Sequence, residues 1–413
     1  MAMLPPRLPT RKPQRKGQIP SEPDAAIRWT DDVALQDRLT ANFFLDDPYV
    51  TQLAGGDTAA ARRFAPGAER SMPSLENFDK MRGTYVRTRA IDRLVDRWLD
   101  NCERAGCKAQ IVSLGAGSDT RFWRYGTDER YKDSLGAYIE VDFSETVTKK
   151  AEKVEGLKDQ ESATSVWTSD SVRKGQNDVL RFQAKASGSG SYYLLAADMR
   201  KPGDPEARSE NPNDLFSQLH AILDVTLPTL LLSECVFVYM KPEESDALLA
   251  WFANKLGSTP LGGIVYEMFG LSSRGIGQTM ARRLADGHGI ALPGAYPDAH
   301  SLADRFTTHG FGNAYALTID EIIKFKYIDL PESKLQAIPS FLRMGNVDEA
   351  PGMLLEKYAV TWGVKSGQGT AQRDLWSRWG YVEAMSSEWS TGDIHGEYQD
   401  SGEGSDGTVT GSG

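Results

Sequence analysis

The sequence predicts an α/β protein built on a doubly wound, mostly parallel sheet with helices on both faces. Two observations carry this prediction. Short apolar runs with strand character recur along the chain, at 110–115, 137–143, 192–198, 228–235, 263–269 and 358–364. Most of the spacers between these runs are long enough for a helix. Near-continuous apolar strands that alternate with helices are typical of a parallel sheet covered on both faces.

Helical patterns occupy several of the spacers. Thr30 is suited to cap a helix whose first turn carries Asp31 and Asp32. Pro242 suits the first turn of a helix over 241–256. Apolar residues at the spacing of one helical face predict a further helix, and they are Ile91, Leu94, Val95, Trp98 and Leu99.

The composition divides the chain into three parts. Residues 1–25 are rich in Pro, Arg and Lys, and we expect a disordered basic tail. We expect a single domain over 26–365, with an insertion at about 270–350 that supplies a lid or substrate-side element. The low-complexity stretch 176–191 predicts a surface loop. The Gly, Ser and acid-rich stretch 366–413 predicts a flexible extension with one short helix at most.

Charge and composition argue against several classes of protein. The net charge of -10 argues against a nucleic-acid surface, which needs clustered Lys and Arg. No apolar stretch approaches the length of a membrane span, and the N-terminus lacks the apolar core of a secretory signal. Three cysteines give no disulfide framework, and five scattered histidines give no metal-ligand pair. We therefore expect a metal-free monomer of a reducing compartment that binds neither nucleic acid nor membrane.

The first apolar run ends in a glycine turn. In a doubly wound sheet, ligands bind outside the carboxyl ends of the strands. Gly115 and Gly117 allow the backbone to approach a ligand closely. The third glycine of a dinucleotide fingerprint would fall at Thr120, and its absence disfavours NAD.

Acidic residues follow the next three runs in order. Asp142 suits ribose hydroxyls, although it also suits the cap of a helix that starts near Ser144. Asp198 can accept a hydrogen bond from the amine of an adenine, and Met199 can lie on its ring. Glu234 would be a costly buried charge without a cation beside it, and a sulfonium ligand with an ammonium group supplies one. The ordered set predicts S-adenosylmethionine as the cofactor.

The segments around these residues resemble the leucine carboxyl methyltransferases. The resemblance runs from about Thr30 to Lys365, and its most specific stretches are IVSLGAGSDTRFW, YIEVDF, RGTYVRT and LPTLLLSECVFVYMKPEES. It implies the Rossmann-like fold of class I methyltransferases, with an N-terminal helical segment and S-adenosylmethionine as cofactor. It also implies a partner, the catalytic subunit of type 2A protein phosphatases, whose terminal leucine carboxylate is methylated. The expected location is the cytoplasm, with the nucleus as a second compartment.

The resemblance also assigns roles to individual residues. Those that match the family's cofactor contacts are Gly115, Asp142, Asp198, Met199 and Glu234. Arg87 matches an arginine that meets a carboxylate in the site, and Tyr239 matches a tyrosine beside the methyl-transfer position. Arg38 matches a basic residue that reaches the cofactor. The unpaired carboxylate of a terminal leucine would itself be the nucleophile, so no general base is expected.

Three departures from the family pattern keep other functions open. The segment after Arg38 is about two residues short, residues 275–277 replace a Phe-Gly pair, and the stretch near 341 is less acidic than usual. The alternatives are a tRNA wybutosine-type or small-molecule carboxyl O-methyltransferase, an NAD-dependent oxidoreductase, and a non-catalytic scaffold that keeps its cofactor.

Overall fold

A mixed sheet forms the centre of the protein. The computed structural model describes residues 24–54, 75–126, 128–131, 133–157, 180–183, 190–203, 214–273, 275–336, 355–368 and 373–381. Within them the sheet has eight strands: β1 Ala109–Leu114, β2 Leu135–Asp142, β3 Leu180–Gln183, β4 Ser191–Ala196, β5 Thr229–Glu234, β6 Leu261–Met268, β7 Asn313–Thr318 and β8 Tyr358–Lys365.

The strand order confirms the predicted doubly wound α/β fold. It runs β3-β4-β2-β1-β5-β6-β8-β7. The neighbouring strands from β4 to β6 are parallel, whereas β8 is antiparallel to both β6 and β7. The order reverses between β1 and β5, which makes the carboxyl ends of these two strands the switch point where a ligand is expected.

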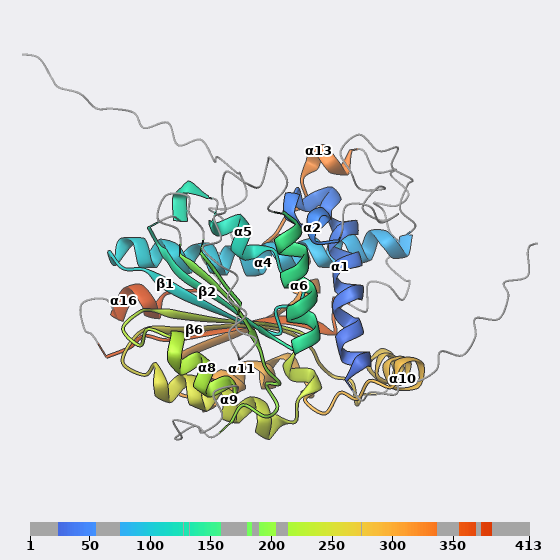
Figure 1. The fold of residues 1–413 in the computed structure, drawn as a ribbon. Coiled ribbons are helices and arrows are strands. Elements are labelled where there is room, and N and C mark those ends of the chain that lie inside the picture. The colour runs from blue at the N-terminus through green and yellow to red at the C-terminus, as the bar shows by residue number, and fades with distance from the viewer. Residues whose placement is uncertain are drawn as a thin grey trace, which may run out of the picture.

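Helices cover both faces of the sheet (Figure 1). The helices α4 Leu75–Arg104, α5 Arg121–Gly126 and α6 Ser144–Leu157 lie on one face, and α8 Leu215–Ile222, α9 Pro242–Lys255 and α11 Ala299–Thr308 on the other. Successive strand residues alternate between two separate buried clusters, so that Ile111 faces α4 and Val112 faces α9. This alternation explains why each central strand reads as a continuous apolar run.

Helix α1, Ala25–Leu45, begins earlier than predicted. Thr30 is not its cap, because its hydroxyl donates to the Ile27 carbonyl within the helix at 2.6 Å. Asp31 and Asp32 therefore lie past the first turn. A short helix, α2 Pro48–Leu53, follows α1, and residues 1–23 of the expected basic tail lie outside the described residues.

Two segments predicted to lie outside the sheet contribute strands to it. Residues 180–183 of the predicted surface loop form β3, which is antiparallel to β4, so that prediction is wrong for them. The segment over 270–350 is not one insertion either, because β7 pairs with β8. Strand β7 lies at the edge of the sheet and is half-buried. Its sequence therefore lacks the continuous apolar run that is typical of the central strands. The part of this segment that contacts the cavity is α10, Ile276–His288.

The C-terminal stretch also departs from its prediction. Residues 373–381 include α16, Arg373–Ser377, and they pack against α4 rather than extending freely. Trp376 and Trp379 are buried against Trp98, and the Trp379 indole donates to the Leu94 carbonyl at 3.0 Å. The remaining elements are α12 Ile319–Lys324, α13 Glu332–Leu335 and the 3-10 turns η1 Glu129–Tyr131 and η2 Phe237–Tyr239. Residues 382–413 lie outside the described part.

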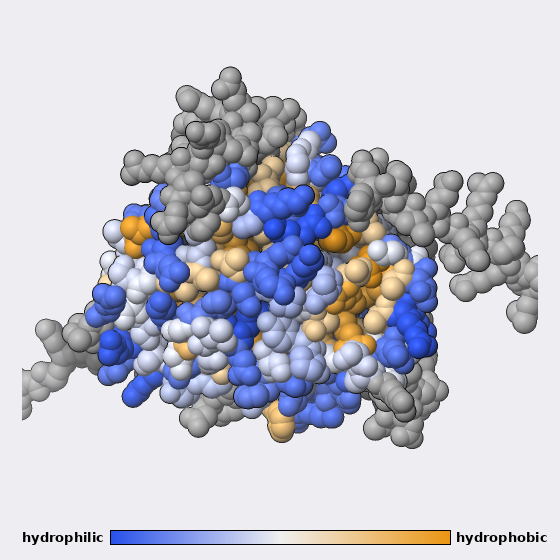
Figure 2. Space-filling model, turned by 90° about the horizontal axis from the view of Figure 1, so that it is seen from below, coloured by the Kyte–Doolittle hydropathy of each residue, from blue (hydrophilic) through white to orange (hydrophobic). Residues whose placement is uncertain are grey.

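Hydrophilic side chains dominate the face of the molecule shown in Figure 2, and an apolar patch interrupts them toward one side. In the described part of the chain, no helix combines the length and apolar character that crossing a membrane requires.

Candidate active site

A cavity of about 800 Å³ lies at the carboxyl ends of the parallel strands. Its walls come from the ends of β1, β2, β4 and β5 and from α1, α4 and α10. All the site residues predicted from the sequence line it: Arg38, Arg87, Gly115, Gly117, Asp142, Asp198, Met199, Glu234 and Tyr239. The structure therefore brings together residues from six separate segments of the chain.

The glycine turn after β1 has the conformation that the sequence predicts. Gly115 and Gly117 have φ angles of 66° and 46°, a region that side chains rarely adopt. A Cβ at Gly115 would collide with Val236, and one at Gly117 with Asp31. A residue with a side chain would therefore be strained at either position and would clash with its neighbours, so glycine is required for the turn to line the cavity as it does.

Asp142 holds this turn in place from the end of β2. Its carboxylate accepts hydrogen bonds from the Gly117 and Phe143 amides at 2.8 and 2.7 Å. Burial raises the pKa of Asp142 to about 6, although the two amide hydrogen bonds act in the opposite direction. The nearby Asp31 carboxylate raises the pKa of Asp142 further, and the charge of Lys150 lowers it. Asp142 forms no salt bridge in the described residues, so its oxygens can accept from polar groups of a ligand.

Asp198 is already bound by an arginine that the sequence did not indicate. The Arg200 guanidinium donates to both Asp198 oxygens, at 2.8 and 2.9 Å. It also donates to both oxygens of Asp24, at the start of α1, at 2.8 Å. Met199, between them in sequence, is buried. Arg200 thus ties the first turn of α1 to the proposed adenine end, and an adenine amine would share Asp198 with it.

Glu234 lies between two arginines at the end of β5. Its oxygens contact Arg121 at 2.5 Å and Arg87 at 3.2 Å. Burial alone would raise the pKa of Glu234, but Arg121 and Arg87 outweigh it and hold the pKa below its usual value. The cation that half-buried Glu234 requires is therefore supplied by the protein itself, and not by the ligand ammonium that the sequence suggested.

Arg38 reaches the cavity floor as part of the same buried charge network. Its guanidinium contacts Asp119 at 3.2 Å, Asp47 at 3.4 Å and Thr120 at 3.0 Å. Arg121 in turn contacts Asp119 and Asp92. With these partners Arg38 is fixed against Asp119 and Thr120, which follow the glycine turn, and its direct contact with the cofactor remains a prediction.

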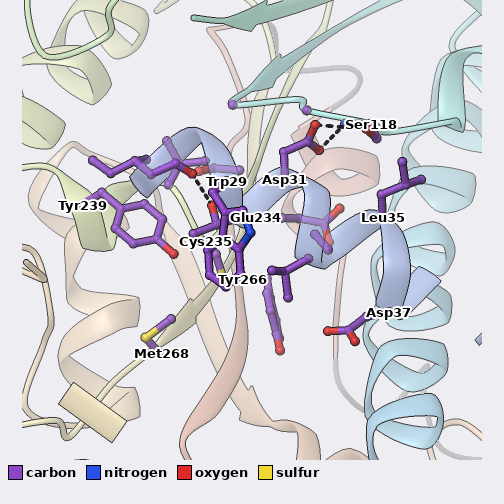
Figure 3. A pocket seen from close by; sticks show the side chains of 18 of the residues that line it. Trp29, Asp31, Leu35, Asp37, Ser118, Glu234, Cys235, Tyr239, Tyr266 and Met268 are labelled. Atoms are coloured by element: carbon purple, nitrogen blue, oxygen red, sulfur yellow. Dashed lines mark hydrogen bonds between the residues drawn. The ribbon is translucent and has the colours of Figure 1, made fainter. Parts of the chain in front are cut away.

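Helix α1 crosses the cavity and is fastened to the glycine turn (Figure 3). The Asp31 carboxylate accepts from the Ser118 amide at 2.7 Å and from its hydroxyl at 3.0 Å. Trp29 stacks on His288 of α10, with ring centroids 4.4 Å apart. Helix α1 therefore joins the cofactor side of the cavity to α10.

Tyr239 ends η2 and points into the cavity beside Met268 (Figure 3). Burial raises the pKa of its hydroxyl well above the usual value, so this group is neutral and can donate a hydrogen bond. Met268 packs with Met280 and Leu284 of α10 in an apolar cluster behind Tyr239. On the other side, the Arg87 guanidinium lies 5.0 Å from the ring centre of Tyr266.

The residues that the sequence reading missed are Asp31, Arg121 and Arg200. Arg121 had a recognisable signal, because a charged residue followed by Phe122 and Trp123 in an apolar helix must have a buried partner. Asp31 had no such signal, since its partner Ser118 is 87 residues away. Arg200 lies two residues after Asp198, but its second partner, Asp24, is 176 residues away. Among the described residues, no group of three His, Cys, Asp or Glu side chains could hold a metal ion.

The fold and this set of strand-end residues define an S-adenosylmethionine-dependent methyltransferase. A bound cofactor fits the residues present, because a cavity of about 800 Å³ lies at the carboxyl ends of the parallel strands and the Asp142 carboxylate lines it without an ion-pair partner in the described residues. The family described as leucine carboxyl methyltransferase matches residues 26–253, and the chain belongs to this family.

Individual relatives align over most of their own length. Leucine carboxyl methyltransferase 1 of Cryptococcus neoformans is 34% identical, over 88% of this chain and 98% of its own. The protein of the same name from Rattus norvegicus is 26% identical, over 85% and 93%. A solved O-methyltransferase family protein from Burkholderia thailandensis is similar over 83% of this chain and 70% of its own, with a TM-score of 0.37 and 7% identity.

Proposed function

We propose that this protein methylates the α-carboxylate of the C-terminal leucine of a type 2A protein phosphatase catalytic subunit. The observation that carries the proposal is that relatives named leucine carboxyl methyltransferase 1 align over nearly the whole domain, while the residues carried over from that family line one cavity. The phosphatase as partner rests on the family resemblance.

The chain's own residues suggest how the substrate is held. A C-terminal carboxylate has a pKa of about 3.3–3.7 and is ionised at neutral pH, so it needs no base. The neutral Tyr239 hydroxyl can donate a hydrogen bond to it and orient it without removing its charge. Arg87 already forms a salt bridge with Glu234. It therefore binds the substrate carboxylate less tightly than an arginine without such a partner would.

The apolar residues around Tyr239 suit the leucine side chain. Met268, Met280 and Leu284 form one wall of the cavity, and Trp29 of α1, which stacks on His288 of α10, also lines the cavity. S-adenosylmethionine, when bound, supplies an electrophilic methyl group next to a positive sulfur. Because charge is lost when that methyl meets a carboxylate, walls that exclude water favour the reaction, and placement in line supplies a further part of the rate.

Methyl transfer to purified phosphatase catalytic subunit tests the proposal. We expect labelled methyl from S-adenosylmethionine to appear on the intact subunit and to be absent when the terminal leucine is deleted. The deleted form keeps every internal Asp and Glu, so it controls for transfer to side-chain carboxylates. Equal labelling of both forms would contradict the terminal leucine as the substrate.

The location and assembly of the protein follow as part of this proposal. Cys102, Cys107 and Cys235 are free thiols, which suits a reducing compartment. We place the reaction in the cytoplasm, with the nucleus as a second compartment, and we expect the enzyme to act as a monomer.

A further inference from the structure

A sharp turn places Tyr239 after the end of β5. Cys235 adopts a left-handed conformation with a φ of 54°, which costs free energy for a residue with a side chain. The chain then enters η2, which ends at Tyr239. Val236 in this turn packs where a side chain at Gly115 would otherwise fit. The position of the turn therefore determines where Tyr239 lies relative to the glycine turn.

One buried carboxylate holds this turn from behind. Glu267 of β6 is fully buried and does not line the cavity. Its Oε1 accepts from the Val236 amide at 2.8 Å, and its carboxylate also meets the amides of Phe237 and Val238. Three successive backbone donors thus converge on a single side chain.

Burying this carboxylate is costly, and few other contacts repay it. Its other oxygen, Oε2, has no hydrogen-bond partner in the described part of the chain. Burial raises the pKa of Glu267 to about 7, against the opposing charge of Arg305. Arg305 is itself buried, 5.0 Å from the ring centre of Phe237 and 4.5 Å from that of Tyr296. An apolar residue would avoid the buried charge but would leave the three amides without this acceptor, so the carboxylate is required by the turn.

We infer that Glu267 is a positioning residue for methyl transfer, which acts through the Cys235–Met240 turn to hold the Tyr239 hydroxyl in place. It cannot touch the substrate, since it lies behind the cavity wall. The inference rests on the proposed function for its effect on rate, but the effect on the turn itself is independent of any substrate.

Glu140 provides a matched control. It is another fully buried carboxylate of the same sheet, on β2, and burial likewise raises its pKa to about 7. Its partners are Lys150 and Tyr192, at 2.5 and 2.7 Å, and it does not line the cavity. Glu267→Gln and Glu140→Gln therefore remove the same buried charge, and only the first touches the turn.

Amide hydrogen exchange tests the effect on the turn. We expect Glu267→Gln to speed deuterium uptake in residues 236–240, whereas Glu140→Gln leaves uptake there as in the wild type. If Glu267→Gln does not fold, Arg305→Met should loosen the same residues, because it removes the charge that keeps Glu267 ionised. Unchanged uptake in both the Glu267 and Arg305 variants would overturn the inference.

Single-turnover methyl transfer tests the route through Tyr239. We expect Glu267→Gln to slow transfer about ten- to hundredfold, with the dissociation constant of S-adenosylhomocysteine nearly unchanged. In a Tyr239→Phe background the same change should cost less than about threefold, because coupled residues are not additive. Fully multiplicative losses would show that Glu267 does not act through Tyr239. Absence of transfer by the wild type would instead count against the proposed function, and the exchange comparison would still decide on Glu267.

Discussion

Asp142 and Glu234 occupy equivalent places in the sheet but differ in their surroundings. Each ends an apolar parallel strand and lines the same cavity. Asp142 accepts hydrogen bonds from two backbone amides and forms no salt bridge within the described residues, and burial raises its pKa to about 6. Glu234 lies between Arg87 and Arg121, and its pKa is lowered. The position of an acid after a strand thus predicts where it lies, whereas its neighbours decide whether its charge is available to a ligand.

The largest expected effect of this difference is on stability. Arg121→Met removes the cation that Asp92, Asp119 and Glu234 share, and the uncompensated buried charges should lower the free energy of unfolding by about 3–5 kcal/mol. Urea unfolding measures the change. The control is Arg130→Met, because Arg130 is exposed and pairs with Asp128 at the surface, where about 1 kcal/mol or less is expected. Similar losses for both variants would show that the network is not held by Arg121.

The second effect concerns pH. Ionised Asp142 should accept hydrogen bonds from ribose hydroxyls, so the affinity for S-adenosylhomocysteine should fall as the pH drops through about 6. Glu234 should add nothing to this change, since its pKa is lowered. Asp142→Asn should bind more weakly at neutral pH and show a flat profile. Calorimetry between pH 5 and 8 compares the wild type with Asp142→Asn. A wild-type affinity that does not change through pH 6 would show that ionised Asp142 does not bind the ribose hydroxyls.

The raised pKa of Asp142 affects the stability of the fold in the opposite direction: acid weakens ligand binding but stabilises the folded state. The folded-state pKa of Asp142 lies above its ordinary value of 3.8, so folding takes up a proton between the two values. The stabilising contribution is therefore complete below pH 3.8 and is lost as the pH rises through about 6. Asp142→Asn should remove this component from the pH dependence of urea unfolding.

The smallest expected effect concerns the fastening of α1. Asp31→Ala removes two hydrogen bonds to Ser118 and should cost about 1–2 kcal/mol in the binding of S-adenosylhomocysteine. Asp32→Ala, an exposed neighbour on the same helix, is the control and should bind as the wild type does. If both variants bind alike, α1 contributes to the cavity through its apolar contacts instead.

The strand-end half of the site could be predicted from the sequence, because it depends only on the apolar pattern of each strand and on the residues that follow that strand directly. Gly115, Gly117 and Asp142 follow apolar runs whose register in a parallel sheet places them together. The helical half depends on contacts across long stretches of chain, such as Asp31 with Ser118, 87 residues apart. The charge state of Glu234 could not be predicted for the same reason, since Arg87 and Arg121 come from different helices.

The edge strands of the sheet and the packed C-terminal segment were also not predicted from the sequence. Strands β3 and β7 lie at the two edges of the sheet and were missed. Half-buried β7 shows no continuous apolar run that could have marked it. In the C-terminal stretch, Trp376 and Trp379 are spaced three residues apart, as on one helical face, and that spacing was a usable sign of a buried segment.

The docking of Trp379 on Leu94 has a consequence for biosynthesis. The two residues are 285 positions apart, so at 5–20 residues per second the ribosome takes about 15–60 s to deliver the tryptophan after the leucine. Until then the apolar face of α4 around Trp98 lacks part of its cover. The nascent polypeptide must keep this surface from aggregating for most of its translation, which makes it a natural client for chaperones that bind emerging chains.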